Sequence, residues 1–398
     1  MSKLEKFLFG SNIILYFLLT IFSYAYIDLN LTLSQNPLVL QFISNMQQIG
    51  YFNRPQASLI YILFIVFAFT LFLCNLWLFF SNKIGLTYLK YSSISNVIIL
   101  IFAYPFLSSD IFNYIFDAKI LVTYNLNPYT HKALDFPSDD WIRFMRWTHR
   151  YSPYGPLWLI YSLVPFTFGF GKFILTLFSF KIFIGVFHLI NTYIIYQILK
   201  QLNPNKVHFG TAFYALNPLF LIEGVVNAHN DIILATFLLL SIYFIVNKSK
   251  LLSIITLVLG FFIKYVPILN LPWLVYFFSK KDNNYNRLLI LNIMTLGIFT
   301  YIISTLRIEI PFISKGSTQV QFQPWYLFWT LPYLALIQKK ELAIVAIILS
   351  VGALLRYIPF LYYGDWSHQG TTIFMQIITI VPAMLIALIL LLKKMVKF

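Results

Sequence analysis

Charged residues are scarce in this sequence, and so is cysteine. Only 10% of the 398 residues are charged, 60% are hydrophobic, and the mean hydropathy is +0.78. So little charge excludes an ordinary soluble domain, whose surface is rich in charged side chains. The one cysteine, Cys74, excludes an intrachain disulfide and leaves the redox compartment open. Zinc, P-loop, dinucleotide and serine-hydrolase motifs are also missing, so the sequence shows no evident binding motif for a water-soluble nucleotide substrate.

Long apolar runs fill the chain. Runs of roughly 17–25 apolar residues mark membrane-spanning helices, and these do not alternate as barrel strands do. The sequence therefore predicts an all-α polytopic membrane protein with about twelve spans. The first run follows Lys3 and Lys6 as in a signal peptide, but "YAYIDLN" offers no small-residue cleavage site, so we expect a retained span. The expected spans are 7–26, 57–80, 91–107, 173–199, 208–226, 232–247, 251–264, 266–279, 288–305, 325–338, 341–357 and 372–392.

The net charge of +15 follows the topology and does not require nucleic acid. With a cytoplasmic N-terminus, 16 of the 28 basic residues fall in short cytoplasmic segments, as the positive-inside rule demands. These are Lys3, Lys6, Lys83, Lys90, Lys200, Lys206, Lys248, Lys250, Lys280, Lys281, Arg287, Lys339, Lys340, Lys393, Lys394 and Lys397. The acids are biased the other way: Asp110, Asp117, Asp135, Asp139, Asp140, Asp231, Glu309 and Asp365 fall at or beyond the outer face, against Glu5, Asp282 and Glu341 inside.

Some apolar runs are too short or too interrupted to span cleanly. The run 154–171 carries Pro156 and Pro165, and counting it as a span would reverse every later loop. We expect a re-entrant or interfacial helix there, within one long outer segment over 108–172. The half-length runs 251–264 and 266–279 suggest a broken hairpin of the kind that lines membrane sites.

Paired carboxylates at the start of the outer segment are the first candidate site. In a helix, Asp110, Tyr114 and Asp117 share one face at i, i+4 and i+7. Ser108, Ser109 and Asp110 also suit the first turn of a surface helix. Asp110 could therefore either cap the helix or take part in catalysis. The ordinary alternative for Asp117 is a position on a solvated helix face.

A second cluster of polar residues, "NAHND", covers 227–231 between two apolar runs. His229 and Asp231 then lie in a tight outer turn, where Asp231 can also cap the next helix. Glu223 lies about two turns earlier within a span, and an acid inside the membrane is a functional candidate by default.

Basic residues near apolar sequence are candidate anion ligands. Lys264 lies between the two half-length runs, where a snorkelling lysine is the ordinary alternative. The segment "IRFMRWTHRYSPYGP" carries Arg143, Arg146, His149 and Arg150, which suit a phosphate or anionic lipid headgroups. The aromatic run "QPWYLFWTLP" (323–332) is typical of a membrane interface.

These segments together resemble the GT-C superfamily of membrane glycosyltransferases, in particular the prokaryotic polyprenyl-phosphate-mannose-dependent α-1,6-mannosyltransferases. The resemblance rests on an ordered set: "SSDIFNYIFDAKI…YNLNPYTH" (108–131), "YSPYGPLW" (151–158), "NPLFLIEGVVNAHND" (217–231), "KYVPILNLP" (264–272) and "PWYLFWTLP" (324–332). It implies a GT-C fold in a single membrane domain over 1–398. Within that domain it implies N-terminal helices in 1–90, a catalytic core in 91–250 with the outer catalytic loop 108–172, and C-terminal helices in 251–398.

The resemblance also implies the chemistry. An inverting enzyme would move a sugar from a polyprenyl-phosphate donor to a glycan or glycolipid acceptor at the outer face of the plasma membrane. The family implies that this sugar is mannose. Asp110 matches the family's essential acid and would act as general base. The departing phosphate needs positive groups, for which Lys264, Arg150, His229 and Arg146 are candidates. Tyr114, Asp117, Glu223 and Asp231 would bind the acceptor or orient the loop, and no cofactor or obligatory metal is expected.

Two alternatives remain open on the sequence. A transporter or flippase for a lipid-linked or anionic solute would explain broken half-helices and intramembrane charges. No convincing internal repeat supports it, and the acid-bearing outer loop has no role in gating. An assembly subunit with an inactive site is the second alternative. The sequence leaves the sugar, the acceptor, the linkage and the oligomeric state unidentified.

Overall fold

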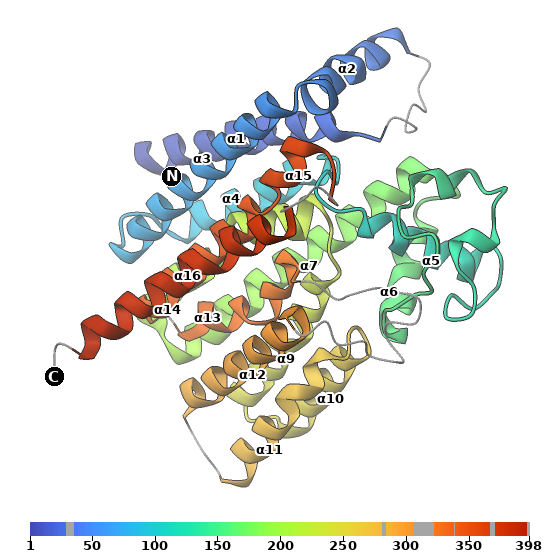
Figure 1. Cartoon of the computed structure of the whole chain (residues 1–398). Helices are drawn as coiled ribbons and strands as arrows, with labels where there is room; N and C mark the ends of the chain where they lie inside the picture. Colours follow the sequence, from blue (N-terminus) through green and yellow to red (C-terminus); the bar gives the residue numbers. More distant parts are fainter. Residues whose placement is uncertain (29–35, 281–283, 306–321, 338, 367–370, 396–398) are drawn as a thin grey trace. The chain divides into compact units, whose positions relative to one another are not determined.

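The chain is helical in the computed structural model, which describes residues 1–28, 36–280, 284–305, 322–337, 339–366 and 371–395. Within these residues every regular element is a helix, so the predicted all-α class is confirmed (Figure 1). The α-helices are α1 Lys3–Ser23, α2 Pro37–Gln47, α3 Arg54–Phe80, α4 Leu86–Ile101, α5 Asp110–Val122, α6 Pro156–Thr167, α7 Phe173–Leu202, α8 Val207–Ala215, α9 Asp231–Val246, α10 Lys250–Phe261, α11 Leu271–Ser279, α12 Tyr285–Thr305, α13 Leu331–Ile337, α14 Lys340–Leu355, α15 Ile358–Tyr363 and α16 Thr371–Met395.

Six described helical stretches are long and apolar enough to cross a membrane: Lys3–Tyr26, Arg54–Phe80, Phe173–Leu202, Tyr285–Ser304, Lys340–Tyr363 and Ile373–Leu390. Each coincides with an expected span. A seventh is possible if Pro204–Ala215 and Phe220–Val226, which are bent by 52° against each other, form one broken span. The other expected spans fall on shorter helices, so the total of about twelve remains a prediction.

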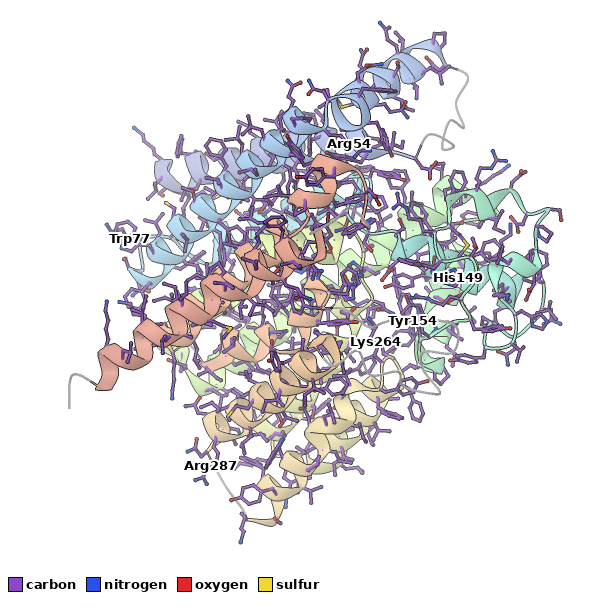
Figure 2. The ribbon with its side chains drawn as sticks, viewed as in Figure 1. Arg54, Trp77, His149, Tyr154, Lys264 and Arg287 are labelled. Atoms are coloured by element: carbon purple, nitrogen blue, oxygen red, sulfur yellow. The ribbon has the colours of Figure 1, made fainter. Side chains whose placement is uncertain are left out.

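Side-chain exposure supports the membrane assignment. Phe67 and Trp77 on α3 are 60% and 58% exposed, and Trp77 projects away from its helix (Figure 2). Large apolar side chains exposed along so long a helix are costly in water and favourable in lipid. The protein is therefore a membrane protein with its apolar helix faces turned to the bilayer.

Backbone contacts divide the chain into two compact units. Unit 1 comprises Met1–Leu107, Lys206–Ile222 and Leu334–Phe398, and unit 2 comprises Ser108–Asn205 and Glu223–Tyr333. In unit 1, α1 packs against α3 and α4, and α14 packs against α16. In unit 2, α7 packs against α6 and α9, and α9 packs against α10. This division does not test the predicted single membrane domain, which remains a prediction.

Polar side chains join the helices of unit 1 within their apolar surroundings. Asn12 Nδ2 on α1 donates to the Tyr88 hydroxyl on α4 at 2.9 Å, and that hydroxyl donates to Asn75 Oδ1 on α3 at 2.7 Å. All three side chains are buried. Hydrogen bonds of this kind hold membrane helices together, because lipid provides no hydrophobic force between them.

The expected outer segment 108–172 folds into α5, two short 3₁₀ helices at Ala133–Asp135 and Asp140–Phe144, and α6. Asp139 fixes the loop to α5: it lies 2.6 Å from Lys119 Nζ and accepts from the Tyr124 hydroxyl at 2.6 Å. Burial alone would raise the pKa of Asp139, but these hydrogen bonds outweigh it and lower the pKa. The 12 residues of α6 rise only about 18 Å, which is short of a full crossing. Its re-entrant or interfacial placement remains a prediction.

A close backbone approach joins the end of this loop to the segment that carries Lys264. The amide of Gly155 donates to the Ile263 carbonyl at 3.0 Å, and the amide of Leu157 donates to the Phe262 carbonyl at 2.9 Å. A Cβ atom at position 155 would lie 2.1 Å from the Phe262 carbonyl oxygen. Glycine is therefore required here, and it brings the motifs "YSPYGPLW" and "KYVPILNLP" together.

The charge-based topology can be tested at two exposed positions, Ser138 and Asn205. In a Cys74→Ser background, we expect a membrane-impermeant thiol reagent added outside to label Ser138→Cys, because segment 108–172 is predicted to lie outside. Asn205→Cys should react only after the membrane is opened. Labelling of Asn205→Cys from outside would show that the topology is wrong.

Candidate functional site

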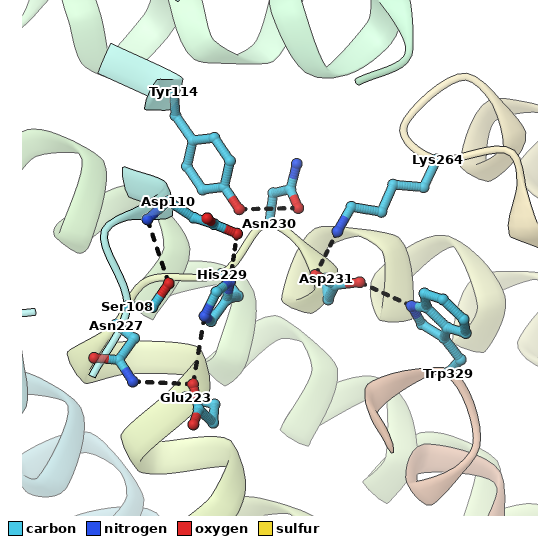
Figure 3. A network of polar contacts seen from close by, with 10 residues as sticks. All are labelled: Ser108, Asp110, Tyr114, Glu223, Asn227, His229, Asn230, Asp231, Lys264 and Trp329. Carbon is cyan, nitrogen blue, oxygen red and sulfur yellow. Dashed lines mark hydrogen bonds and ion pairs between the residues drawn. The ribbon is translucent and has the colours of Figure 1, made fainter. Parts of the chain in front are cut away.

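Polar side chains from four segments of unit 2 meet in one network (Figure 3). The segments are the start of α5, the stretch 223–231 that ends at the first residue of α9, the Lys264 position after α10, and the 3₁₀ helix η8, Pro324–Trp329. The network brings together Asp110, Tyr114, Glu223, His229, Asp231 and Lys264, all of which the sequence singles out. It is therefore the candidate active site.

Asp110 is the first residue of α5, and its side chain turns toward the network. Its Oδ2 lies 3.6 Å from Nδ1 of His229, and its side chain is 16% exposed. Ser109 occupies the N-cap position and makes no side-chain cap bond. The Asp110 carboxylate is thus in the first turn, where the helix dipole favours it, but it is not the cap itself.

His229 lies between two carboxylates with its ring fully buried. Nε2 is 3.4 Å from Glu223 Oε2, on the far side of the ring from Asp110. The imidazole stacks on Trp325 with ring centroids 3.6 Å apart. Both contacts to carboxylates are longer than an ordinary hydrogen bond, as is common for catalytic contacts without substrate. The stacking fixes the ring plane, so both nitrogens stay directed at the acids.

The turn 227–230 is held from several sides. Asn227 Nδ2 donates to Glu223 Oε2 at 2.9 Å. From α7, Lys181 Nζ donates to the Val226 carbonyl at 3.0 Å, and Asn191 Nδ2 donates to the Ile232 carbonyl at 2.8 Å. Lys181 thus satisfies the Val226 carbonyl just before the turn, and Asn191 ties the first turn of α9 to α7.

Ala228 within this turn has φ +56°, in the left-handed region that residues other than glycine rarely adopt. Such a backbone costs about 1–2 kcal/mol and persists where its surroundings enforce it. Here the conformation carries the chain through a tight turn that presents His229 to Asp110.

Asp231 is the first residue of α9, and each of its carboxylate oxygens has a partner. Its Oδ2 lies 2.6 Å from Lys264 Nζ, and its Oδ1 accepts from Trp329 Nε1 at 2.8 Å. The Asp231 side chain is fully buried and that of Lys264 is 16% exposed. Lys264 also approaches the ring of Tyr154, with Nζ 5.8 Å from the centroid (Figure 2). Lys264, which the sequence predicts to bind phosphate, therefore already has one carboxylate partner.

Tyr114 connects α5 to the same turn. Its hydroxyl donates to Asn230 Oδ1 at 3.4 Å, and its ring packs edge-on against Tyr154 and Trp158, with centroids 5.0 Å away in each case. The side chain is fully buried. Tyr114 thus positions the turn against α5.

Asp117 and Arg150 lie near the network but outside its hydrogen bonds. Burial raises the pKa of Asp117 to about 7, against the opposing influence of the Ser152 hydroxyl and the Arg150 guanidinium. The Arg150 charge interacts with both Asp110 and Asp117. Arg146 is exposed, and the network does not include it.

Trp325, Trp329, Asn227 and Asn230 belong to the site, and the sequence did not identify them as site residues. The tryptophans lie in the aromatic run that suggests a membrane interface. Among the described residues no three His, Cys, Asp or Glu side chains group as a metal site, and metal independence remains a prediction.

The fold and network define a helical membrane protein in which a buried histidine lies between two carboxylates. A family model described as alpha-(1->6)-mannopyranosyltransferase, N-terminal domain, matches residues 37–280, which is more than half of the chain. The chain therefore belongs to this MptA_B family of mannosyltransferases, as the resemblance predicted. Comparisons with curated proteins and with solved structures found no match. Family membership identifies a glycosyltransferase and displaces the transporter alternative.

The buried pair of Asp231 and Lys264 predicts a large effect on stability. Asp231→Asn leaves the ammonium without its counter-ion, and breaking a buried pair costs about 3–5 kcal/mol. We expect a clearly lower Tm in detergent, partly restored by Asp231→Asn with Lys264→Met. The matched control is Asp140→Asn, whose carboxylate is 85% exposed and pairs with Arg143 at the surface. Equal Tm values for Asp231→Asn and Asp140→Asn would contradict the structural role of the pair.

Proposed function

We propose that this mannosyltransferase moves a mannosyl group from a polyprenyl-phosphate donor to an acceptor hydroxyl at the outer face of the plasma membrane. One observation carries the proposal: the partly exposed carboxylate of Asp110 lies beside a buried histidine that a second carboxylate holds from behind. Family membership supports mannosyl transfer. A donor with a polyprenyl tail cannot leave the bilayer, which explains why the enzyme is a membrane protein.

Asp110 acts as the general base. It takes the proton from the acceptor hydroxyl while that oxygen attacks the anomeric carbon of the donor sugar. The bond between that carbon and the phosphate oxygen breaks, and its electron pair leaves with the phosphate. One direct displacement inverts the configuration at the anomeric carbon. Because phosphate is already a good leaving group, the reaction needs no obligatory metal.

His229 and Glu223 support the base. A proton on Nε2 directed at Glu223 leaves Nδ1 free to face the protonated Asp110 carboxyl. Nδ1 is then the neighbouring acceptor for the proton that Asp110 has taken up. Trp325 keeps the ring in this plane throughout. This arrangement returns Asp110 to its ionised form, and the released phosphate then takes the proton from His229, which restores the site for the next turnover.

Lys264 and Arg150 bind the donor phosphate. The ammonium of Lys264 uses one of its three donors on Asp231 and retains two for phosphate oxygens. Arg150 carries its charge close to Asp110, where phosphate must leave. His229 and Arg146, the other cations expected to bind phosphate, have weaker support: the first lies between two acids, and the second is exposed.

The function is tested on purified protein in detergent with a panel of polyprenyl-phosphate sugars and an α-1,6-linked octyl mannoside acceptor. We expect release of polyprenyl phosphate with the mannosyl donor. Asp110→Asn should fold and bind donor normally but lose about 10²–10⁴-fold in transfer rate, because general base catalysis contributes that much.

Asp117→Asn is the paired variant for this assay, and we expect a smaller loss because Asp117 does not face the reacting hydroxyl. Asn caps a helix as well as Asp, so a purely structural Asp110 would leave Asp110→Asn active. Full activity of that variant would reject the catalytic assignment.

The phosphate assignment is tested by Lys264→Met. Loss of one contact to a charged group costs roughly 1.5–3 kcal/mol, so donor use should weaken about tenfold to a hundredfold. Lys264→Arg, which keeps the charge, should retain most of it. Unchanged donor kinetics in a Lys264→Met protein with normal Tm would remove Lys264 from the donor site.

A further inference from the structure

Among the buried polar atoms that lack hydrogen-bond partners in the described residues, three belong to groups that act on one another electrostatically. They are Oδ2 of Asp117, Oγ of Ser152 and Nε of Arg150. Asp117 and Ser152 are only 7% and 8% exposed. Each such atom costs about 1–3 kcal/mol when left unpaired. Three such atoms near the proposed catalytic base indicate a place where a polar ligand completes the bonds.

The backbone around these atoms is fixed before any ligand arrives. The amide of Ser152 donates to the Pro128 carbonyl at 3.0 Å, and the Tyr129 hydroxyl donates to the Tyr154 carbonyl at 2.8 Å. On α5, the ion pair of Lys119 and Asp139 ties the loop to the helix. The backbone holds the three groups close together, with the Ser152 hydroxyl and the Arg150 guanidinium both acting on the Asp117 carboxyl, which is the property of a preorganised binding site.

The electrostatics favour a neutral ligand rich in hydroxyl groups. The Asp117 carboxyl has a pKa of about 7, so it exists in both protonated and ionised forms and can donate or accept. Ser152 can do the same, and Arg150 donates. A metal would find only one carboxylate among the three groups. Adjacent hydroxyls of a sugar ring match this mixture of donors and acceptors.

The spacing on α5 separates this cluster from the chemistry. Asp117 follows Asp110 by two helical turns on the same face, a rise of about 10 Å. Asp117 therefore cannot reach the proton that Asp110 takes, although both side chains face the same region. A sugar contacting one carboxylate at its reacting end can extend toward the other.

We propose that Asp117, Ser152 and Arg150 form a binding subsite for the ring hydroxyls of a sugar, which sets the substrate specificity of the transfer. The subsite rests on the proposed function, since the sugar belongs to the donor or to the acceptor. In either case its hydroxyls replace the missing partners of the three buried atoms.

The test uses Asp117→Asn and Ser152→Ala, with Asp140→Asn as the matched control on an exposed aspartate of the same loop. We expect the KM of the affected substrate to rise about tenfold in each subsite variant with a smaller change in kcat. Varying the octyl mannoside at saturating donor, and then the polyprenyl-phosphate mannose at saturating acceptor, identifies which sugar is held. A loss of kcat with both KM values unchanged would overturn the subsite.

Monodeoxy analogues of the octyl mannoside and of the donor sugar extend the test. One deoxy position should weaken the wild type but add no further loss in Ser152→Ala, because both changes remove the same hydrogen bond. Additive losses at every position would contradict the assignment. This comparison needs only Ser152→Ala, which deletes one unpartnered hydroxyl and should fold normally.

A binding arm separates this proposal from the proposed function. The Tm of the wild type should rise on adding the octyl mannoside or the donor, and the rise should shrink in both subsite variants. This measurement needs no turnover. Failure of transfer with intact, Asp117-dependent sugar binding would reject the catalytic proposal alone, and absence of any Tm rise in the wild type would reject the subsite.

Discussion

The salt bridge between Asp231 and Lys264 is the contact on which the arrangement of the site depends. Burying either charge alone in apolar surroundings is unfavourable, so the two segments must bring these side chains together. The pairing joins the start of α9 to the segment after α10, and the bond from Trp329 adds η8 at the same carboxylate. Once Asp231 is fixed, the turn before it has little freedom, and His229 is directed toward Asp110.

The cost of burying polar groups also explains the surroundings of the turn. Before the turn, Lys181 on α7 donates to the Val226 carbonyl, and after it Asn191 on α7 donates to the Ile232 carbonyl in the first turn of α9. These side chains look like isolated polar residues in an apolar helix. They help to hold the turn in place, and the turn presents His229 to Glu223.

The sequence predicted the charged members of the site because charges in apolar sequence stand out on energetic grounds. It could not predict their partners: Asp110 and His229 are far apart in the chain, and no period in the sequence relates them. The role of Trp325 in the site could not be predicted for another reason, since aromatic residues are common at membrane interfaces. The helices were predicted better than the number of crossings, because an apolar run such as α9 has the right composition without the full length.

The four acids of this region differ in what their oxygens already do, and the difference supports the proposal that Asp110 is the base. Asp231 has both oxygens engaged by Lys264 and Trp329. Glu223 is fully buried and accepts from Asn227. Asp117 is buried on the next turns of α5, with a pKa that leaves it partly protonated at neutral pH. Asp110 keeps a partly exposed carboxylate whose neighbour, His229, can receive a proton. A base must meet substrate and then release its proton, and among these acids Asp110 alone satisfies both conditions.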